Sequence, residues 1–255
     1  MWPFKNKTKP GAAEYTLPKG WHELSRAQFI DVAHIVCKGE LQRVAWTKII
    51  WILSGLKPKD FIRIEEAEHL KHIPELQWVT KFEFTGNESM LPFIMHRFQL
   101  CAGPQQGLRN FSFDQFVCAY QQLQAHHKEK DDASLNRLMS ILYNRKEFLF
   151  EQMEENYLRF ATLERNIKNA AYINFLALVN GFAKLYPLSH GSKGVNLLQS
   201  ALNPWDKLGD ELAGDKFGLR ANVGITNVHY IFIHLENNEE KRIQHEFNKK
   251  KHGNG

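Results

Sequence analysis

Two groups of histidines have spacings that could support metal binding or acid–base chemistry. His69 and His72 lie three positions apart on a predicted helix, with Glu65 and Glu66 one turn earlier. Imidazoles at this spacing can share one helical face and bind a metal ion. Because no matched third and fourth ligand stands elsewhere, surface histidines on an acidic helix are the favoured interpretation. We therefore expect no metal and no cofactor.

A second group lies near the C-terminus, where His229, His234 and Glu236 could supply an acid–base pair. Positions five apart do not share a helical face, so this pattern is weak. The adjacent His126 and His127 end a predicted helix. Imidazolium groups at that place complement the negative end of the helix dipole, which favours a structural role.

Two catalytic motifs can be checked directly. The stretch 189–194, Ser-His-Gly-Ser-Lys-Gly, has the composition of a phosphate-binding loop. The P-loop pattern, however, requires GxxxxGK followed by Ser or Thr after a strand, and the stretch does not match it. The G-x-S-x-G motif of serine hydrolases does not occur either. We therefore expect a protein that is not an enzyme, while an enzyme with an unrecognised site stays an alternative.

Aromatic side chains outside regular helical spacing are the candidate contact residues for a partner, because tryptophan and other large side chains often anchor interfaces. Some lie in the N-terminal arm, some in an irregular connection and some near turns. The candidate binding residues are Trp2, Phe4, Trp78, Phe93, Phe98 and Trp205. Structural packing is the competing interpretation for the tryptophans, and isolated exposed aromatics need no partner.

The elements that would position these residues are mainly helical. Ser25 is a good N-cap for a first helix that stops at Gly39. The next helix, over 41–54, carries Trp46 and Trp51 and is apolar on most sides, which predicts a central position. One helix over 59–72 and a short one over 75–80 should follow. The fold class is therefore predicted to be mainly α, with a multi-helix body.

The remaining chain continues this pattern after one interruption. Residues 82–110 combine glycines and prolines with phenylalanines, which predicts an ordered irregular connection with short extended pieces. Later helices are expected over 112–126, 135–143, 146–160, 162–186, 204–213 and 226–248. Within the last, 228–235 could form a strand, but the charged residues that follow favour a helix.

An internal sequence repeat suggests that a helical unit is duplicated. Leu24–Ile30 resembles Phe111–Val117, with serine, glutamine and phenylalanine matched 87 positions apart. Lys59–Ile62 and Lys146–Leu149 match at the same offset, and Ile52-Leu53 parallels Ile141-Leu142 with a two-residue slip. Two such units side by side would give a pseudo-symmetric body. Chance similarity of two capped amphipathic helices is the alternative.

These observations predict five segments. They are a flexible basic arm over 1–20, a first helical unit over 21–81, an ordered connection over 82–110, a second helical unit over 111–187, and a helical C-terminal segment with a basic tail over 188–255. A chain of 255 residues can bury a sizeable core as one large domain or two small ones.

The charge distribution bears on partners. The formal charge is +5, but six lysines lie in the two tails, at Lys5, Lys7, Lys9 and positions 249–251, so the body is near neutral. A nucleic-acid-associated factor that uses these tails is possible but not favoured, because such proteins usually carry a basic face on the folded part. The longest uncharged stretch, 169–183, is too short and polar to span a membrane and predicts a buried helix.

Several motifs together resemble a known group. They are Leu17–Ser25 with Gln28-Phe29, Gly103-Pro104 before Ser112–Phe116, Ile141–Tyr143, Trp205, Phe217-Gly218 and His234–Glu236. This layout resembles uncharacterised tail-region proteins of phages and prophages of Bacteroidetes-type bacteria. The resemblance implies a structural or assembly protein, such as a chaperone or adaptor, of a phage-like tail or neck. Its partners would be other phage-like structural proteins or itself, in the host cytoplasm or in the virion.

Overall fold

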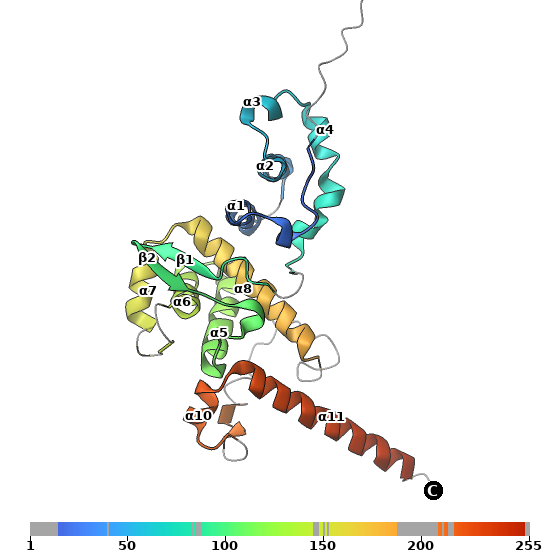
Figure 1. Cartoon of the computed structure of the whole chain (residues 1–255), viewed down its shortest axis with the longest axis vertical. Helices are drawn as coiled ribbons and strands as arrows, with labels where there is room; N and C mark the ends of the chain where they lie inside the picture. Colours follow the sequence, from blue (N-terminus) through green and yellow to red (C-terminus); the bar gives the residue numbers. More distant parts are fainter. Residues whose placement is uncertain are drawn as a thin grey trace, which may run out of the picture. The chain divides into compact units, whose positions relative to one another are not determined.

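The computed structural model describes residues 15–39, 41–82, 84, 88–144, 148–149, 151, 153–187, 209–210, 212–213 and 217–252. The chain divides into two compact units, Met1–Phe82 and Glu83–Gly255, each with its own core. Helices dominate both units, so the predicted mainly-α, multi-helix fold class is confirmed (Figure 1).

In its described residues, the first unit contains six short helical elements. They are η1 (Trp21–Glu23), α1 (Arg26–Cys37), α2 (Arg43–Ser54), α3 (Pro58–Phe61), α4 (Glu66–Leu70) and η2 (Ile73–Thr80). Helix α1 begins where the sequence predicts, because Ser25 and Gln28 form a reciprocal capping box. Helix α2 ends at Gly55, whose φ of 64° places it in the left-handed region that glycine adopts without strain.

The predicted single helix over 59–72 is wrong, because α3 and α4 are separated by a turn. The side chain of His69 lies at this break. Its ring stacks on Phe61 at 3.8 Å, and its Nε2 lies 3.1 Å from the Phe61 carbonyl oxygen. A continuous helix would use that carbonyl for the amide of residue 65. The chain turns at Ile62 instead, and this side chain is exposed.

Helix α2 packs against both α1 and α4, in line with the predicted central position, but it is not covered on all sides. Ile49 and Leu53 are buried, but Val44 and Trp51 on other sides of the helix are exposed. A unit of this size has too few elements to cover a helix on all sides, so part of an apolar surface stays in contact with solvent.

The second unit begins with a hairpin and continues as a helical bundle. Its elements are β1 (Phe93–His96), β2 (Gln99–Ala102), η4 (Gln106–Leu108), α5 (Phe113–Glu129), α6 (Asp132–Leu142), α7 (Met153–Ala161), α8 (Arg165–Leu185), α10 (Arg220–Ile225) and α11 (Val228–His252). The two strands pair antiparallel, with Phe93 opposite Ala102. Extended pieces in the connection and a helix after position 226 both match the prediction.

Helix α8 is the centre of the second unit and is buried along most of its length, as predicted for the uncharged stretch. Phe182 on α8 lies 5.4 Å from Phe116 on α5 and 4.7 Å from Phe232 on α11, measured between ring centroids. The buried Asn174 is satisfied by the Met90 amide and the Ser89 hydroxyl. Among the described residues, no helix combines the length and apolar character needed to cross a membrane.

The two predicted helical units share one local arrangement at the positions that match in the internal sequence repeat. Ser112 caps α5 by accepting from the Gln115 amide, as Ser25 does for α1. The Gln28 side chain donates to the Ile52 carbonyl on α2 at 3.1 Å, and the Gln115 side chain donates to the Ile141 carbonyl on α6 at 2.9 Å. A glutamine therefore ties each capped helix to the helix that follows it. Duplication of the unit stays a prediction.

Other expectations fall partly on residues outside the described ranges. The arm is described only from Tyr15 onward, and the expected helix start at Pro204 is not among the described residues. Helix α7 begins at Met153, later than the predicted 146.

Candidate functional site

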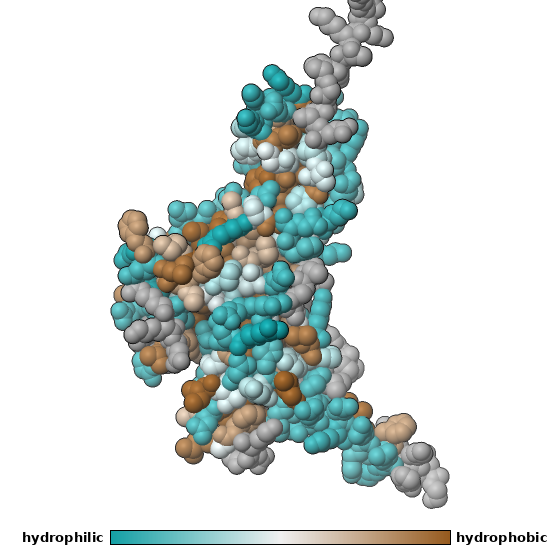
Figure 2. Space-filling view, in the orientation of Figure 1, coloured by the Kyte–Doolittle hydropathy of each residue, from teal (hydrophilic) through white to brown (hydrophobic). Residues whose placement is uncertain are grey.

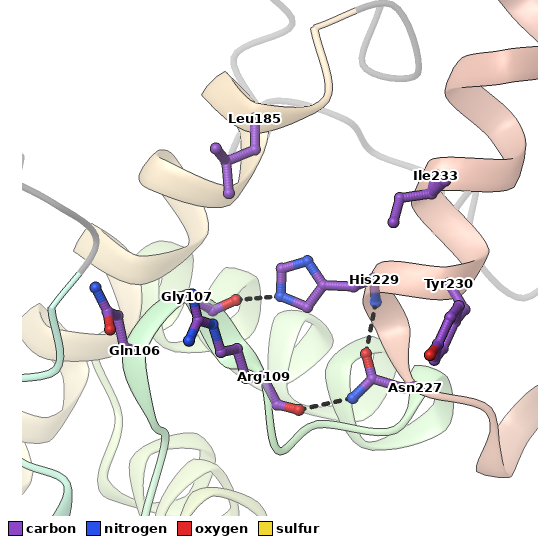
Figure 3. Close-up of a pocket in the computed structure, with 8 residues that line it drawn as sticks. All are labelled: Gln106, Gly107, Arg109, Leu185, Asn227, His229, Tyr230 and Ile233. Carbon is purple, nitrogen blue, oxygen red and sulfur yellow. Dashed lines mark hydrogen bonds between the residues drawn. The ribbon is translucent and has the colours of Figure 1, made fainter.

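A hollow of about 740 Å³ lies within the second unit, beside the start of α11 and the turn of η4 (Figure 3). Eight residues from three segments line it. They are Gln106, Gly107, Arg109, Leu185, Asn227, His229, Tyr230 and Ile233.

Backbone and amide contacts hold two walls of this hollow together. The Asn227 side-chain amide donates to the Arg109 carbonyl at 2.7 Å, and its oxygen accepts from the His229 amide at 3.0 Å (Figure 3). The Val228 amide donates to the Phe111 carbonyl at 3.0 Å. Asn227 therefore starts α11 and at the same time fixes the loop that precedes α5.

His229 bridges the same walls through both ring nitrogens. Nε2 donates to the Gly107 carbonyl at 2.6 Å, and Nδ1 accepts from the Tyr186 hydroxyl at 2.6 Å. Burial is the main cause that lowers the pKa of His229, with a smaller contribution from the Arg109 charge. The ring is therefore a neutral tautomer that links α8, α11 and η4, which is a structural role rather than that of a poised base.

The other members of the suspected acid–base group are elsewhere. His234 packs edge-on against Phe217 at 5.4 Å and bonds to Asn238 at 3.0 Å. Neither His234 nor Glu236 lines the hollow. The structure does not bring the three side chains together as an acid–base group.

The histidines at the other predicted positions are also structural. His69 is buried, contrary to the expected surface position, and bonds to the Tyr15 hydroxyl at 2.9 Å. In the described residues, no three metal-ligating side chains form a cluster. His126 and His127 lie in the last turn of α5, where burial lowers the pKa of both rings and so disfavours their charged form. His126 bonds to the Asp131 carbonyl.

The hairpin β1–β2 carries two of the predicted contact residues, Phe93 and Phe98. Its inner face, with Ile94, His96 and Cys101, is buried. The strand residues that alternate with these buried ones point outward, because successive residues of a strand face opposite sides of the sheet. The outward apolar residues, with their exposed fractions, are Phe93 at 44%, Met95 at 54%, Leu100 at 59% and, in the turn, Phe98 at 100%. We call these four residues the hairpin face.

The turn of the hairpin is strained. Arg97 has a φ of 48° and Phe98 a φ of 60°, and they join the paired residues His96 and Gln99. A two-residue turn with both central φ values positive is the type I′ arrangement, which favours Asn-Gly. Left-handed backbone costs residues with a Cβ roughly 1–2 kcal/mol each. The side chain of Phe98 is fully exposed, so none of the described residues packs against it to offset this cost.

Several contacts fix the hairpin to the helical body. The Ala102 and Asn144 backbones exchange two hydrogen bonds of 2.9 and 3.0 Å. The His96 ring bonds to the Arg159 carbonyl at 2.9 Å, and Arg97 donates to the Thr162 hydroxyl at 3.2 Å. Hydrophobic colours gather over the hairpin region in Figure 2. These contacts with the helical body therefore hold the hairpin face in a fixed position.

The remaining predicted residues divide into two groups. Trp78 is half-buried and packs edge-on against Trp21 at 5.4 Å, and the Trp21 indole donates to the Lys81 carbonyl. This favours a packing role within the first unit. Trp2, Phe4 and Trp205 lie outside the described residues.

Sequence reasoning missed Met95 and Leu100. The alternation of apolar residues through 93–102 could have indicated them. Comparison with known proteins found no matching family model, no matching curated protein and no matching solved structure.

Proposed function

We propose that this chain is a non-enzymatic binding protein that acts as a structural or assembly factor, a chaperone or adaptor, of a phage-like tail or neck. Its hairpin face is the contact surface. The single observation that carries the binding role is the fully exposed Phe98 in a strained turn, beside three further exposed apolar side chains.

The size of the hairpin face sets the kind of binding. Full burial of a Phe, Leu or Met side chain contributes about 1.5–3 kcal/mol, so the exposed parts of these four side chains give roughly 4–8 kcal/mol before costs. Loss of translational and rotational freedom on association costs about 4–15 kcal/mol. One hairpin face alone therefore gives weak binding. Repeated partner subunits would raise the effective affinity through multivalency, as in a particle built from many copies.

The partner should match the chemistry of this face. Phe98 requires an apolar pocket, and the neighbouring Arg97 adds a positive charge beside it. A depression with apolar walls and a carboxylate at its rim fits both side chains. The tail or neck context is supported by the sequence motifs that resemble tail-region proteins.

The test is co-expression of the chain with the products of the genes adjacent to its own, followed by size-exclusion chromatography with light scattering. The wild-type chain should elute in a defined complex, and the variant M95Q/F98Q should lose it. The matched control is L219Q, because Leu219 is equally apolar and exposed but lies outside the hairpin. A complex that survives M95Q/F98Q, or the lack of a complex with every neighbouring product, contradicts the proposal.

A further inference from the structure

The hollow beside the start of α11 has the size of a small-molecule site and an apolar wall. Its volume of about 740 Å³ lies within the roughly 300–1,000 Å³ that is usual for such sites. Leu185 at the end of α8 is 51% exposed and Ile233 of α11 is 47% exposed. Both side chains point into the space between the two helices (Figure 3). A ligand that covers this apolar surface gains free energy from its removal from water.

The polar groups of the hollow differ in whether the chain itself satisfies them. The Asn227 amide and both ring nitrogens of His229 are bonded within the chain, and Gln106 is not free either. The Arg109 guanidinium and the Tyr230 hydroxyl remain, because no described residue gives them a hydrogen-bond or ion-pair partner. A guanidinium is positive and only donates hydrogen bonds. A negative ligand group that accepts hydrogen bonds therefore complements it.

The charges around the hollow give such a ligand a direction. No carboxylate is among the described residues that line it. Burial raises the pKa of the Tyr186 hydroxyl and the charge of Glu236 raises it further, which places that carboxylate near the end of α8. A second negative group of a ligand would be repelled there. The anionic end of a ligand therefore belongs at Arg109, and an uncharged end belongs beside Leu185.

We propose that this hollow binds a free amphiphilic monocarboxylate of the medium-chain fatty acid class. Its carboxylate lies on the Arg109 guanidinium, which can bind both oxygens at once. Its hydrocarbon chain lies against Leu185 and Ile233. The site uses no residue of the hairpin face, so the inference goes beyond the proposed tail or neck function and does not depend on it.

The two parts of the ligand should contribute separately to its affinity. Burial of one methylene group raises an affinity about fourfold, so decanoate should bind up to roughly fifteenfold more tightly than octanoate. A hydrogen bond to a charged group contributes roughly 10–100-fold. An uncharged compound with the same chain should therefore bind at least about tenfold more weakly than the carboxylate.

The experiment is isothermal titration calorimetry of the full chain with decanoate and with decanamide, below the concentrations at which decanoate forms micelles. Decanamide has the same hydrocarbon chain and no charge. The wild-type chain should prefer decanoate at least about tenfold. R109Q should bind decanamide as the wild type does but lose the preference for decanoate. Partial unfolding would weaken both probes, so this selective loss is specific to the carboxylate contact.

Matched variants separate the hollow from other surfaces. R63Q removes an equally exposed arginine from the first unit and should leave both affinities unchanged. M95Q/F98Q alters the hairpin face and should also bind decanoate normally. L185N/I233N should lose the advantage of decanoate over octanoate, while the preference for decanoate over decanamide stays. Circular dichroism at 222 nm checks that each variant keeps its helices.

Several results would overturn the proposal. One is a wild-type chain that binds no decanoate, or that binds decanoate and decanamide equally. Another is a loss of decanoate binding in R63Q or in M95Q/F98Q that matches the loss in R109Q. Co-flotation of the chain with phosphatidylcholine vesicles that contain oleate, without binding of free decanoate, would indicate a membrane surface in place of a free acid. None of these results bears on the complex that tests the hairpin face.

Discussion

Replacement of the hairpin turn by Asn-Gly should stabilise the second unit while it removes the binding surface. Arg97 and Phe98 both occupy left-handed backbone, at φ values of 48° and 60°. Relief of this strain is worth roughly 2–4 kcal/mol for two residues. Glycine returns about 1 kcal/mol of that through the greater freedom of the unfolded chain, and loss of the exposed Arg97–Thr162 hydrogen bond returns about 0.5 kcal/mol more. The loss of the Phe98 side chain costs little, because it is fully exposed.

The variant R97N/F98G should therefore gain roughly 0.5–2.5 kcal/mol in the free energy of unfolding. For a unit of this size, 1 kcal/mol corresponds to about 2–4 °C in Tm. The expected increase is thus about 1–10 °C, measured by differential scanning calorimetry. The same variant should lose the complex with neighbouring gene products. A variant that is more stable but no longer binds its partner would indicate that the turn is retained for binding rather than for stability.

A control variant separates strain relief from loss of the surface. Lys130 also has a positive φ, 56°, but it ends α5 away from the hairpin. K130G should raise the stability by a smaller amount and leave the complex intact, because glycine is the preferred residue at such a helix end. An unchanged or lower Tm for R97N/F98G would refute the argument that the turn stores strain.

Two further predictions concern stability. Burial lowers the pKa of His96, His126 and His229 below the 6.5 of an unfolded chain, so the unfolded state binds more protons below that pH. The free energy of unfolding should stay level above pH 7 and fall as the pH drops below 6.5. The fall should be at most about 1.4 kcal/mol per pH unit for each histidine. Urea titrations across pH 5–8 measure this dependence, and a free energy of unfolding that does not fall would contradict the prediction. Q115A should lower the free energy of unfolding by about 1 kcal/mol. Q28A should cost at least as much, because it removes the capping-box bond to the Ser25 amide together with the partly buried bond to Ile52. Hydrogen exchange should show faster opening of α5 and α6 in the first variant and of α1 and α2 in the second.

The helix starts could be predicted because their signals are local. Ser25 and Ser112 cap their helices through bonds to residues three positions later, which the sequence displays directly. The break between α3 and α4 could not be predicted, because it depends on the ring of His69 reaching back to Phe61. The exposed side of α2 depends on how many elements surround it, which periodicity does not reveal.

The candidate surface could be predicted only in part. Phe93 and Phe98 are prominent because aromatic residues are rare in polar connections. The hairpin itself was hidden, because its turn carries Arg-Phe in place of the Asn-Gly that marks a type I′ turn. Met95 and Leu100 join the surface only through the strand register. The unusual turn is thus both the reason that the sequence concealed the hairpin and the main reason to assign it a function.

Side-chain oxidation by hydroxyl radicals, read by mass spectrometry, tests the central claim most directly. The wild-type chain would be compared alone and in its complex with the neighbouring gene products. Met95 and Phe98 should be oxidised readily in the isolated chain and severalfold more slowly in the complex, while the exposed Trp51 of the first unit serves as the reference. Equal oxidation of Met95 and Phe98 in both states would contradict the claim that the hairpin face is the binding surface.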